Sequence, residues 1–215
     1  MSMPNTDSLP EPVRYYHTPR APNPRRTQIF MAEKGIELET VNINLMEGDH
    51  KTPEYLEKVG SPQIPALELA DGTVLVESPT ICRYLEAFYP EPNMLGRDAR
   101  EIAMIDMWQR RIELRLMITI AMCFRHTNPK MAALEDQSPD WGETNAGRID
   151  GRLAELDTQL QGREWIAADR LTIADVTGIV AVDFLRLIKR DIPEDMTALR
   201  EWRARMHERP STALK

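Results

Sequence analysis

The chain has 215 residues and a formal net charge of −7, from 27 basic and 34 acidic side chains. This length is enough for one or two compact domains, and 42% hydrophobic with 28% charged residues argues against a disordered, collagen-like or coiled-coil chain. The acidic balance argues against a nucleic-acid partner, because such proteins present a basic stripe. One basic island, formed by Arg14, Arg20, Arg25 and Arg26, would instead focus a small anion.

The first residues and the two cysteines indicate a cellular compartment. Residues 1–11 are polar and punctuated by prolines, so we expect a disordered tail and no secretory signal. No stretch approaches the roughly 18 uninterrupted apolar residues that a membrane span needs. Cys82 and Cys123 lie in apolar-periodic segments without a paired motif, which favours buried free thiols. We therefore expect a cytoplasmic protein that binds no membrane.

The first structured segment predicts a strand, a loop and a helix. Val13–His17 is β-prone, and the three prolines within residues 18–24 predict an extended loop, because proline restricts helix formation. A helix should then run over about residues 25–34 and end at Gly35, a residue type common just after a helix.

Short strands and one more helix follow. Residues 37–42 alternate in strand fashion, and Pro53 suits the first turn of a short helix. Asp71-Gly72 lies between the apolar runs 66–69 and 73–76, which is a strong local hairpin signal.

A capped helix closes the predicted first domain. Ser78 is expected to be its N-cap, with Pro79 at the first helical position and the end near Phe88. The predicted order βαβ-α-ββα makes an α/β domain with a four-stranded mixed sheet over residues 12–92. Residues 93–97 are the predicted linker.

Residues 98–215 contain no convincing strand and predict an all-α helical bundle. Long helical patterns cover residues 101–124 and 144–161. Thr172 and Asp175 form a capping box, with Asp in place of the usual Glu, so we assign them a structural role. The helix behind this box is apolar nearly all round, and we expect it at the centre of the second core.

Three spaced elements are specific when taken together and in order. Ile64-Pro65 precedes a strand, Glu77-Ser78 follows the next strand, and an all-helical half with the capping box comes after. This combination resembles the cytosolic glutathione S-transferase family, bacterial type, over about residues 13–210. The resemblance implies a thioredoxin-like domain followed by a helical-bundle domain, glutathione as co-substrate, no metal, and a two-fold homodimer.

The resemblance also implies where glutathione binds. In the family the proline of such an Ile-Pro pair is cis, which turns the Ile64 backbone toward the cysteinyl unit. Ser78 and Glu77 would hold the γ-glutamyl carboxylate and ammonium at a helix N-terminus, and basic loop residues would hold the glycyl carboxylate. The implied contacts are His50, Lys51, Gln63, Ile64, Pro65, Glu77 and Ser78.

The residues by themselves leave plainer interpretations of these positions open. The proline is equally consistent with a trans bond before an edge strand. Ser78 fits an ordinary N-cap beside a solvated Glu77, and His50 with Lys51 fits a solvated loop. A metal site at His50 is improbable, because the other histidines show no ligand spacing.

The residue that activates the sulfur is an open question. Family members use Tyr, Ser or Cys in the first strand or the loop after it, because the thiolate is the nucleophile. Related bacterial members often have Ser or Thr where this chain has Ala21, so serine- and cysteine-type mechanisms are in doubt. Asn23 ranks first as a sulfur donor, although it equally fits an N-cap. The further candidates are Thr18, Arg20 and Tyr16; strand alternation does not decide whether Tyr15 or Tyr16 faces the core.

In the family, the second-substrate pocket lies between the domains and is lined by the long helix after the linker. Met104, Trp108 and Arg111 lie on that helix here, although a core or dimer-interface role fits them as well. We interpret the chain as a glutathione S-transferase for a small hydrophobic electrophile, with a detoxifying role. The alternatives are a glutathione-dependent disulfide or peroxide reductase, and a catalytically weak glutathione-binding or scaffold protein, which Ala21 favours.

Overall fold

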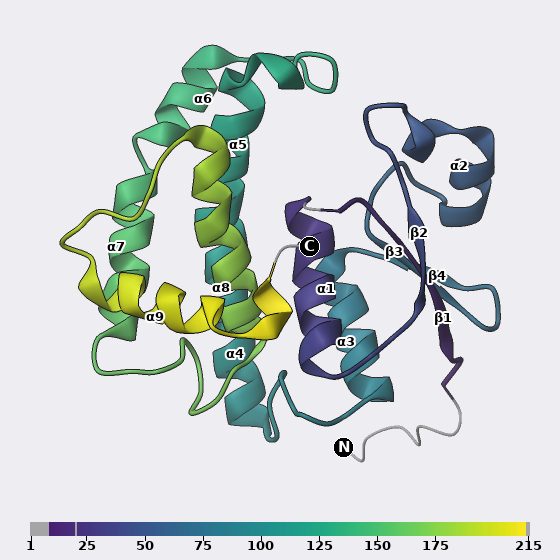
Figure 1. The fold of residues 1–215 in the computed structure, drawn as a ribbon, viewed down its shortest axis with the longest axis horizontal. Helices are drawn as coiled ribbons and strands as arrows, with labels where there is room; N and C mark the ends of the chain where they lie inside the picture. Colours follow the sequence, from purple (N-terminus) through teal and green to yellow (C-terminus); the bar gives the residue numbers. More distant parts are fainter. Residues whose placement is uncertain (1–8, 20, 214–215) are drawn as a thin grey trace. The chain divides into compact units, whose positions relative to one another are not determined.

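The computed structural model describes residues 9–19 and 21–213, and it divides after Met94 into two compact units (Figure 1). We call the part up to Met94 unit 1 and the part from Leu95 to Ala213 unit 2. Residues 1–8 of the predicted tail and the candidate residue Arg20 lie outside the described residues.

Unit 1 contains the predicted four-stranded mixed sheet, in the order β2-β1-β3-β4. The β1–β2 pair is parallel, and the β1–β3 and β3–β4 pairs are antiparallel. Figure 1 shows α1 and α3 side by side on one face of this sheet and α2 on the other. The elements are β1 (Pro12–His17), α1 (Pro22–Glu33), β2 (Glu39–Asn42), the short 3-10 helix η2 (Asp49–Lys51), α2 (Pro53–Val59), β3 (Ala66–Leu69), β4 (Val74–Val76) and α3 (Ser78–Phe88).

The pairing of Ala66 determines where the loops of unit 1 meet. Ala66 pairs with Tyr16 of β1 on one side and with Val76 of β4 on the other. Because β2 runs parallel to β1, the ends of β1, β2 and β4 and the start of β3 all lie at the same end of the sheet. The described residues that leave the sheet there are 18–19 and 21, 43–52, 63–65 and 77–78. We call this end of the sheet the loop end.

Helix α1 begins three residues earlier than predicted. It starts at Pro22, because proline is tolerated in a first turn, where the backbone N–H has no intrahelical acceptor. The N-cap residue is Ala21, so the interpretation of Asn23 as an N-cap is wrong. Asn23 instead occupies the second position of the helix.

Helix α3 also differs from the prediction at its start. Its N-cap is Glu77, and the predicted N-cap Ser78 is the first helical residue. Glu77 has φ 69°, in a region that residues other than glycine rarely adopt. Such strain persists only where the surrounding structure over-determines it, and it is common at binding sites.

Tyr15 and Tyr16 are both buried, and they lie on opposite faces of the sheet. The Tyr15 hydroxyl donates to the carbonyl oxygen of Pro24 in α1, at 3.0 Å. Tyr16 instead packs with Tyr55 and Val59 of α2. The alternation along β1 therefore places one tyrosine in each of two apolar layers.

A buried ammonium group ties the end of α1 to the end of α3. The Lys34 side chain has no exposed surface and donates to the carbonyl oxygens of Tyr89 at 2.7 Å and Pro92 at 2.8 Å. It also pairs with the Glu86 carboxylate at 2.8 Å, whose other oxygen accepts from the Met94 N–H. The segment after α3 is therefore held by one charge pair and its hydrogen bonds.

All of the regular secondary structure in the described part of unit 2 is helical, as predicted. Its predicted long helix over 101–124 is one run of α4, η3 and α5, in which η3 is a stretch of π-helix. The elements are α4 (Ala99–Arg111), η3 (Ile112–Met117), α5 (Ile118–Thr127), η4 (Pro129–Met131), α6 (Pro139–Ala146), α7 (Ile149–Leu160), α8 (Ile173–Phe184), η5 (Leu185–Ile188), α9 (Thr197–His207) and η6 (Pro210–Thr212).

The predicted single helix over residues 144–161 is wrong in one respect. The structure has two helices there, because α6 ends at Ala146 with Gly147 as its C-cap, and α7 begins after Arg148. Helix α6 starts at Pro139, again with proline in the first turn, which the sequence analysis did not identify.

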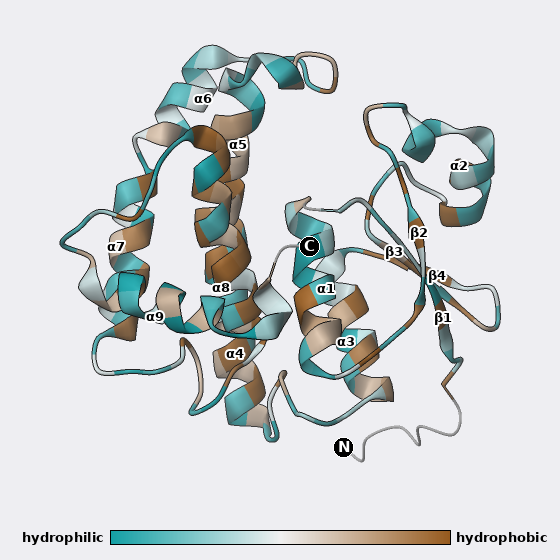
Figure 2. Cartoon of the chain, in the orientation of Figure 1, coloured by the Kyte–Doolittle hydropathy of each residue, from teal (hydrophilic) through white to brown (hydrophobic). Residues whose placement is uncertain are grey.

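Helix α8 is the centre of the core of unit 2, and Figure 2 shows it as one of the most hydrophobic helices. All of its residues are buried. The capping box is confirmed: Asp175 accepts from the Thr172 N–H at 3.0 Å, and also from the Ile166 N–H at 2.9 Å and the Trp202 indole N–H at 3.1 Å. Complete burial nevertheless raises the pKa of Asp175 to about 6.

Replacing Lys34 by Met should destabilise the protein by about 3 to 5 kcal/mol, because a buried carboxylate then loses its cation. The double variant Lys34→Met with Glu86→Gln should recover part of this loss, since no uncompensated charge remains. Urea unfolding followed by circular dichroism measures both effects. A wild-type midpoint for Lys34→Met would show that this pair does not hold the end of α3.

Candidate functional site

The start of α1 offers few hydrogen-bond donors, and they belong to one residue. Pro22 and Pro24 have no N–H, and the N–H of Arg25 donates to the Ala21 carbonyl at 3.0 Å. Asn23 is exposed, and neither its N–H nor its side-chain amide has a partner among the described residues. A helix N-terminus carries partial positive charge, so this turn is suited to an anionic atom.

Two of the predicted sulfur donors already donate within the protein. The Thr18 hydroxyl donates to the Ile43 carbonyl, and the Tyr16 hydroxyl donates to Glu68 at 2.8 Å. In this structure both hydroxyl protons are therefore committed to acceptors within the protein, which favours Asn23 over Thr18 and Tyr16 as the sulfur donor. Arg20 lies outside the described residues.

Glu68 joins Tyr16 to two cations. It forms an ion pair with Lys58 of α2 and another with Arg14 of β1 at 3.2 Å. These partners hold the pKa of Glu68 below its usual value of 4.5, with the Lys58 hydrogen bond as the largest cause. The pKa of Tyr16 is raised, first by burial and then by its bond to Glu68.

The segment before β3 presents backbone groups without partners. The Ile64–Pro65 peptide bond is cis. Within the part of the chain that the structure describes, the N–H and C=O of Ile64 make no hydrogen bond. The carbonyl oxygen of the exposed residue Gln63 accepts from the Tyr55 hydroxyl at 2.6 Å.

The start of α3 offers a second helix N-terminus. Ser78 is 2% exposed, and its hydroxyl has no partner in the described ranges. Pro79 has no N–H, and the N–H of Ile81 donates to the Glu77 carbonyl at 2.9 Å. The first turn therefore presents the Ser78 N–H and hydroxyl beside the exposed carboxylate of Glu77.

The basic pair at η2 is not a simple solvated loop. His50 is 7% exposed, and its buried Nδ1 atom has no hydrogen-bond partner among residues 9–19 and 21–213. Burial lowers the pKa of His50, and the neighbouring Lys51 lowers it further. Lys51 itself is exposed.

These groups share one location, because every segment that carries them leaves the sheet at its loop end. A helix N-terminus, a pair of free backbone groups, a second helix N-terminus and a basic pair come together there. The predicted residues on these segments are His50, Lys51, Gln63, Ile64, Pro65, Glu77 and Ser78, and Asn23 lies in the first turn of α1, directly after the first segment.

The candidates for the second substrate share one face of α4 in unit 2. Met104 is 41% exposed, Trp108 is half-buried and Arg111 is exposed. The Arg111 guanidinium lies over the Trp108 ring, 5.0 Å from its centroid.

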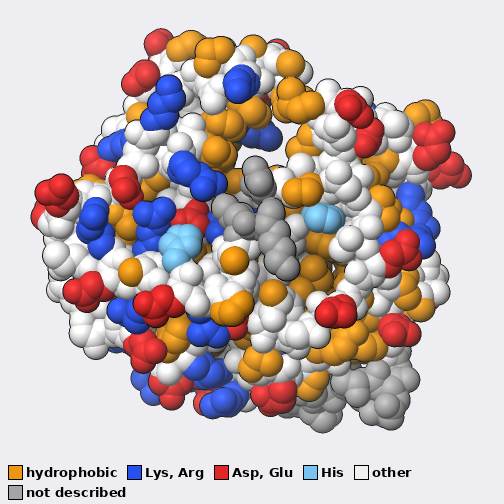
Figure 3. All heavy atoms as spheres, viewed as in Figure 1, with side chains coloured by type: hydrophobic (Ala, Val, Ile, Leu, Met, Phe, Trp, Pro, Cys, Tyr) orange, Lys and Arg blue, Asp and Glu red, His pale blue; other side chains and the backbone are white. Residues whose placement is uncertain are grey.

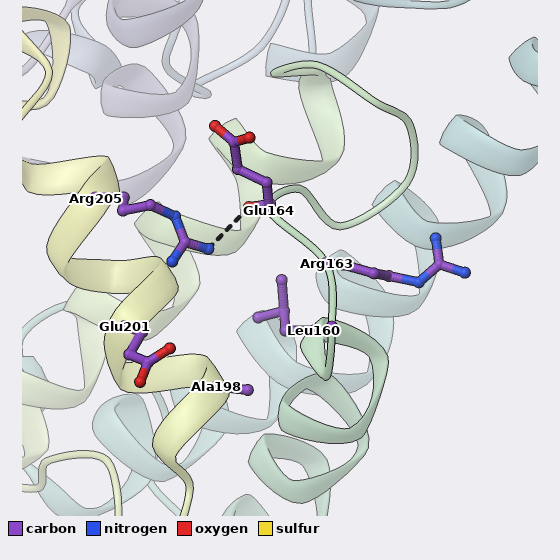
Figure 4. A pocket seen from close by; sticks show the side chains of 7 residues that line it. Leu160, Arg163, Glu164, Ala198, Glu201 and Arg205 are labelled. Carbon is purple, nitrogen blue, oxygen red and sulfur yellow. Dashed lines mark hydrogen bonds between the residues drawn. The ribbon is translucent and has the colours of Figure 1, made fainter.

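Unit 2 has a hollow of its own, of about 400 Å³, between α7 and α9 (Figure 4). Its lining has both signs of charge, and Arg205 donates from it to the Glu164 carbonyl at 3.0 Å. Mixed charge is also the character of the wider surface in Figure 3, where basic and acidic side chains are interspersed. None of the predicted site residues lines this hollow.

The described residues contain no group of three or more His, Cys, Asp or Glu side chains placed to hold a metal ion. Cys82 and Cys123 are free and buried, as predicted. None of the helices that the structure describes has the length and apolar character to span a membrane.

The fold and the loop end define a class of protein: a thioredoxin-like unit whose helix starts present unpartnered donors, followed by a helical unit. Residues 21–87 match the glutathione S-transferase N-terminal domain, and residues 115–210 match the glutathione S-transferase C-terminal domain. The chain belongs to the cytosolic glutathione S-transferase family.

Individual relatives agree over nearly the whole chain. Glutathione S-transferase 2 of Saccharomyces cerevisiae is 34% identical over 209 residues, 95% of this chain and 90% of the relative. The crystal structure of Gtt2 from S. cerevisiae superposes with a TM-score of 0.86, covering 93% of this chain and 98% of that one at 34% identity. A glutathione S-transferase domain-containing protein from Marinobacter aquaeolei gives 0.87, at 33% identity and with 94% and 100% covered.

Tyr55 is not among the predicted site residues, although its hydroxyl donates to Gln63, the residue before Ile64. An aromatic residue in a short helix is usually a core residue, and the pattern of α2 contains no signal for a specific hydroxyl contact.

Glu68→Gln should lower stability most at neutral pH. The pKa of Glu68 is depressed in the folded state, so its contribution is present above about pH 4.5 and lost as the pH falls further. Urea unfolding at pH 7 and at pH 4 should show a larger difference from wild type at pH 7. Glu57→Gln, which changes an exposed carboxylate of α2, is the matched control. If the wild type and Glu68→Gln differed in free energy of unfolding by the same amount at pH 7 and at pH 4, this role of Glu68 would be contradicted.

Proposed function

We propose that the protein is a glutathione transferase, which binds glutathione at the loop end of unit 1 and activates its thiol for attack on a small hydrophobic electrophile. Family membership supports the class of reaction. The observation that carries the proposal is the set of unpartnered donors at this one end of the sheet.

Each part of glutathione has a complementary polar group at the loop end. The γ-glutamyl carboxylate suits the Ser78 hydroxyl and N–H at the start of α3, and its ammonium suits the Glu77 carboxylate. The cysteinyl unit would pair strand-like with the free N–H and C=O of Ile64. The glycyl carboxylate suits Lys51 and the unpartnered Nδ1 of His50.

Asn23 is the residue we assign to thiolate activation. The thiolate is the nucleophile, and each unit by which its pKa falls needs about 1.4 kcal/mol of stabilisation. The Asn23 N–H, its side-chain amide and the dipole of α1 act on the same anionic atom. Ala21 precedes them as N-cap and has no hydroxyl to contribute.

A second candidate function follows from Ala21. A glutathione-binding protein with weak catalysis would keep the contacts at α3 and η2 and would not need a strong sulfur donor. A glutathione-dependent disulfide or peroxide reductase is the further alternative. A weakly catalytic glutathione-binding protein would differ from a transferase in failing to lower the pKa of the bound thiol. A reductase would differ from a transferase in its second substrate, a disulfide or peroxide in place of an electrophile.

The remaining expectations complete the proposal. Met104, Trp108 and Arg111 form the wall for the hydrophobic electrophile, because a methionine and an aromatic ring adapt to varied apolar shapes. The protein acts in the cytoplasm as a homodimer and detoxifies such compounds. Size-exclusion chromatography with light scattering tests the dimer.

The double variant Glu77→Ala with Ser78→Ala should lose retention on immobilised glutathione. It removes the ammonium contact and the hydroxyl, and the alanine Cβ leaves the backbone strain at Glu77 unchanged. Elution with free glutathione measures specific retention. Arg83→Ala, on the same helix beyond its first turn, is the control. Full retention of the double variant would remove α3 from the binding site.

Asn23→Ala should raise the pKa of the bound glutathione thiol. The backbone N–H and the helix dipole remain, so we expect a rise of about one unit, roughly a tenfold loss of thiolate at limiting pH. Thiolate absorbance followed against pH measures this shift. An unchanged titration would take the Asn23 side chain out of the mechanism.

A further inference from the structure

Tyr55 of α2 connects two segments of the loop end, residues 43–52 before α2 and residues 63–65 after it. Its backbone N–H donates to the Thr52 hydroxyl oxygen at 3.3 Å, and that hydroxyl donates to the Asp49 carbonyl at 3.0 Å. Its side-chain hydroxyl donates to the Gln63 carbonyl at 2.6 Å. One residue thus attaches to η2 through its backbone and to the segment before β3 through its side chain.

The ring of Tyr55 has little freedom to move. It is 6% exposed and lies in a cluster with Tyr16, Val59 and Ala66, against which Ile64 also packs. The rings of Tyr55 and Tyr16 meet in a T-shaped contact, with centroids 6.2 Å apart. Because the Tyr16 hydroxyl is bonded to Glu68, the ring that supports Tyr55 is itself held in place.

The hydroxyl of Tyr55 remains a donor at neutral pH. Burial raises the pKa of Tyr55 to about 12, so the phenol keeps its proton. The Gln63 carbonyl is an acceptor only, and the direction of the bond is therefore determined.

The segment that Tyr55 holds has few other attachments. The Gln63 N–H reaches the Ser61 hydroxyl at a long 3.4 Å, and in the described chain the Ile64 backbone makes no hydrogen bond. The short bond from Tyr55 is therefore the main polar restraint on the residues just before Pro65.

We propose that Tyr55 is a positioning residue for glutathione: its hydroxyl holds the Gln63 carbonyl so that the free N–H and C=O of Ile64 face the cysteinyl unit. This inference rests on the proposed function. It assigns to α2 a role at two parts of the ligand, the cysteinyl unit and the glycyl carboxylate, since Thr52, the N-cap of the same helix, also holds η2 with His50 and Lys51. Pre-ordering the segment raises affinity, because less conformational entropy is lost on binding.

Tyr55→Phe tests the proposal, because it keeps the ring and removes only the hydroxyl. We expect glutathione to bind about fivefold more weakly by calorimetry, the effect of losing roughly one hydrogen bond. In turnover with a chloronitrobenzene as electrophile, KM for glutathione should rise and kcat should stay unchanged, because the lost interaction serves binding alone.

A truncated ligand locates the effect within the site. γ-Glutamylcysteine lacks the glycyl carboxylate and keeps the cysteinyl backbone that Ile64 would pair with. Tyr55→Phe should therefore weaken γ-glutamylcysteine by the same factor as glutathione. Thr52→Ala, which removes the cap that holds η2, should weaken glutathione alone. The reverse pattern, or an equal loss for both ligands in both variants, would overturn the assignment.

Tyr84→Phe is the matched control, because the Tyr84 hydroxyl also donates to a backbone carbonyl in unit 1, that of Pro10, at 2.6 Å. It should lower thermal stability in the same way and leave both affinities unchanged. An unchanged affinity in Tyr55→Phe, or an equal loss in Tyr84→Phe, would overturn the inference. Failure of the wild-type protein to bind either ligand would instead overturn the proposed function.

Discussion

The two-sided pairing of β3 is the constraint on which the candidate site depends. β3 is only four residues long, and all of them are buried between β1 and β4. Its register sets Ala66 opposite Tyr16 and Val76 at once, so the segments before β3 and after β4 are neighbours of the loop after β1. A slip by one residue would turn every side chain of β3 to the other face. The site and the core of unit 1 therefore rest on the same register.

Prolines at the helix starts decide which donors face this site. Pro22 and Pro24 remove two N–H groups from the first turn of α1, and Pro79 removes one from α3. What remains is a small set of backbone donors, each next to a polar side chain, Asn23 or Ser78. The N–H groups that remain, with the partial positive charge of the helix start, can serve a single carboxylate or thiolate. The same prolines are compatible with the helices because first-turn N–H groups have no intrahelical acceptor.

Unit 1 uses the buried hydroxyl groups of three tyrosines for internal support. Tyr15 donates to α1, Tyr16 to Glu68 and Tyr55 to Gln63, and each bond joins two different elements of unit 1. Such a tyrosine is held in one position, because packing restrains both of its side-chain torsion angles and the hydrogen bond fixes its hydroxyl. In unit 2 the buried carboxylate of Asp175 also joins separate segments, since it accepts from the Ile166 N–H before α8 and from the Trp202 indole in α9.

Local patterns were enough to predict several parts of this protein. The strands, the helical second half and the capping box of Thr172 and Asp175 depend on residues within a few positions of one another, and family motifs such as Ile64-Pro65 have a set order along the chain. The tertiary structure alone decided that Tyr16 donates to Glu68, 52 residues away, that Tyr55 reaches Gln63 across a turn, and that His50 is buried. Burial and the direction of a hydroxyl depend on what packs against a side chain from other elements. The spacing of residues along the chain contains no record of those neighbours.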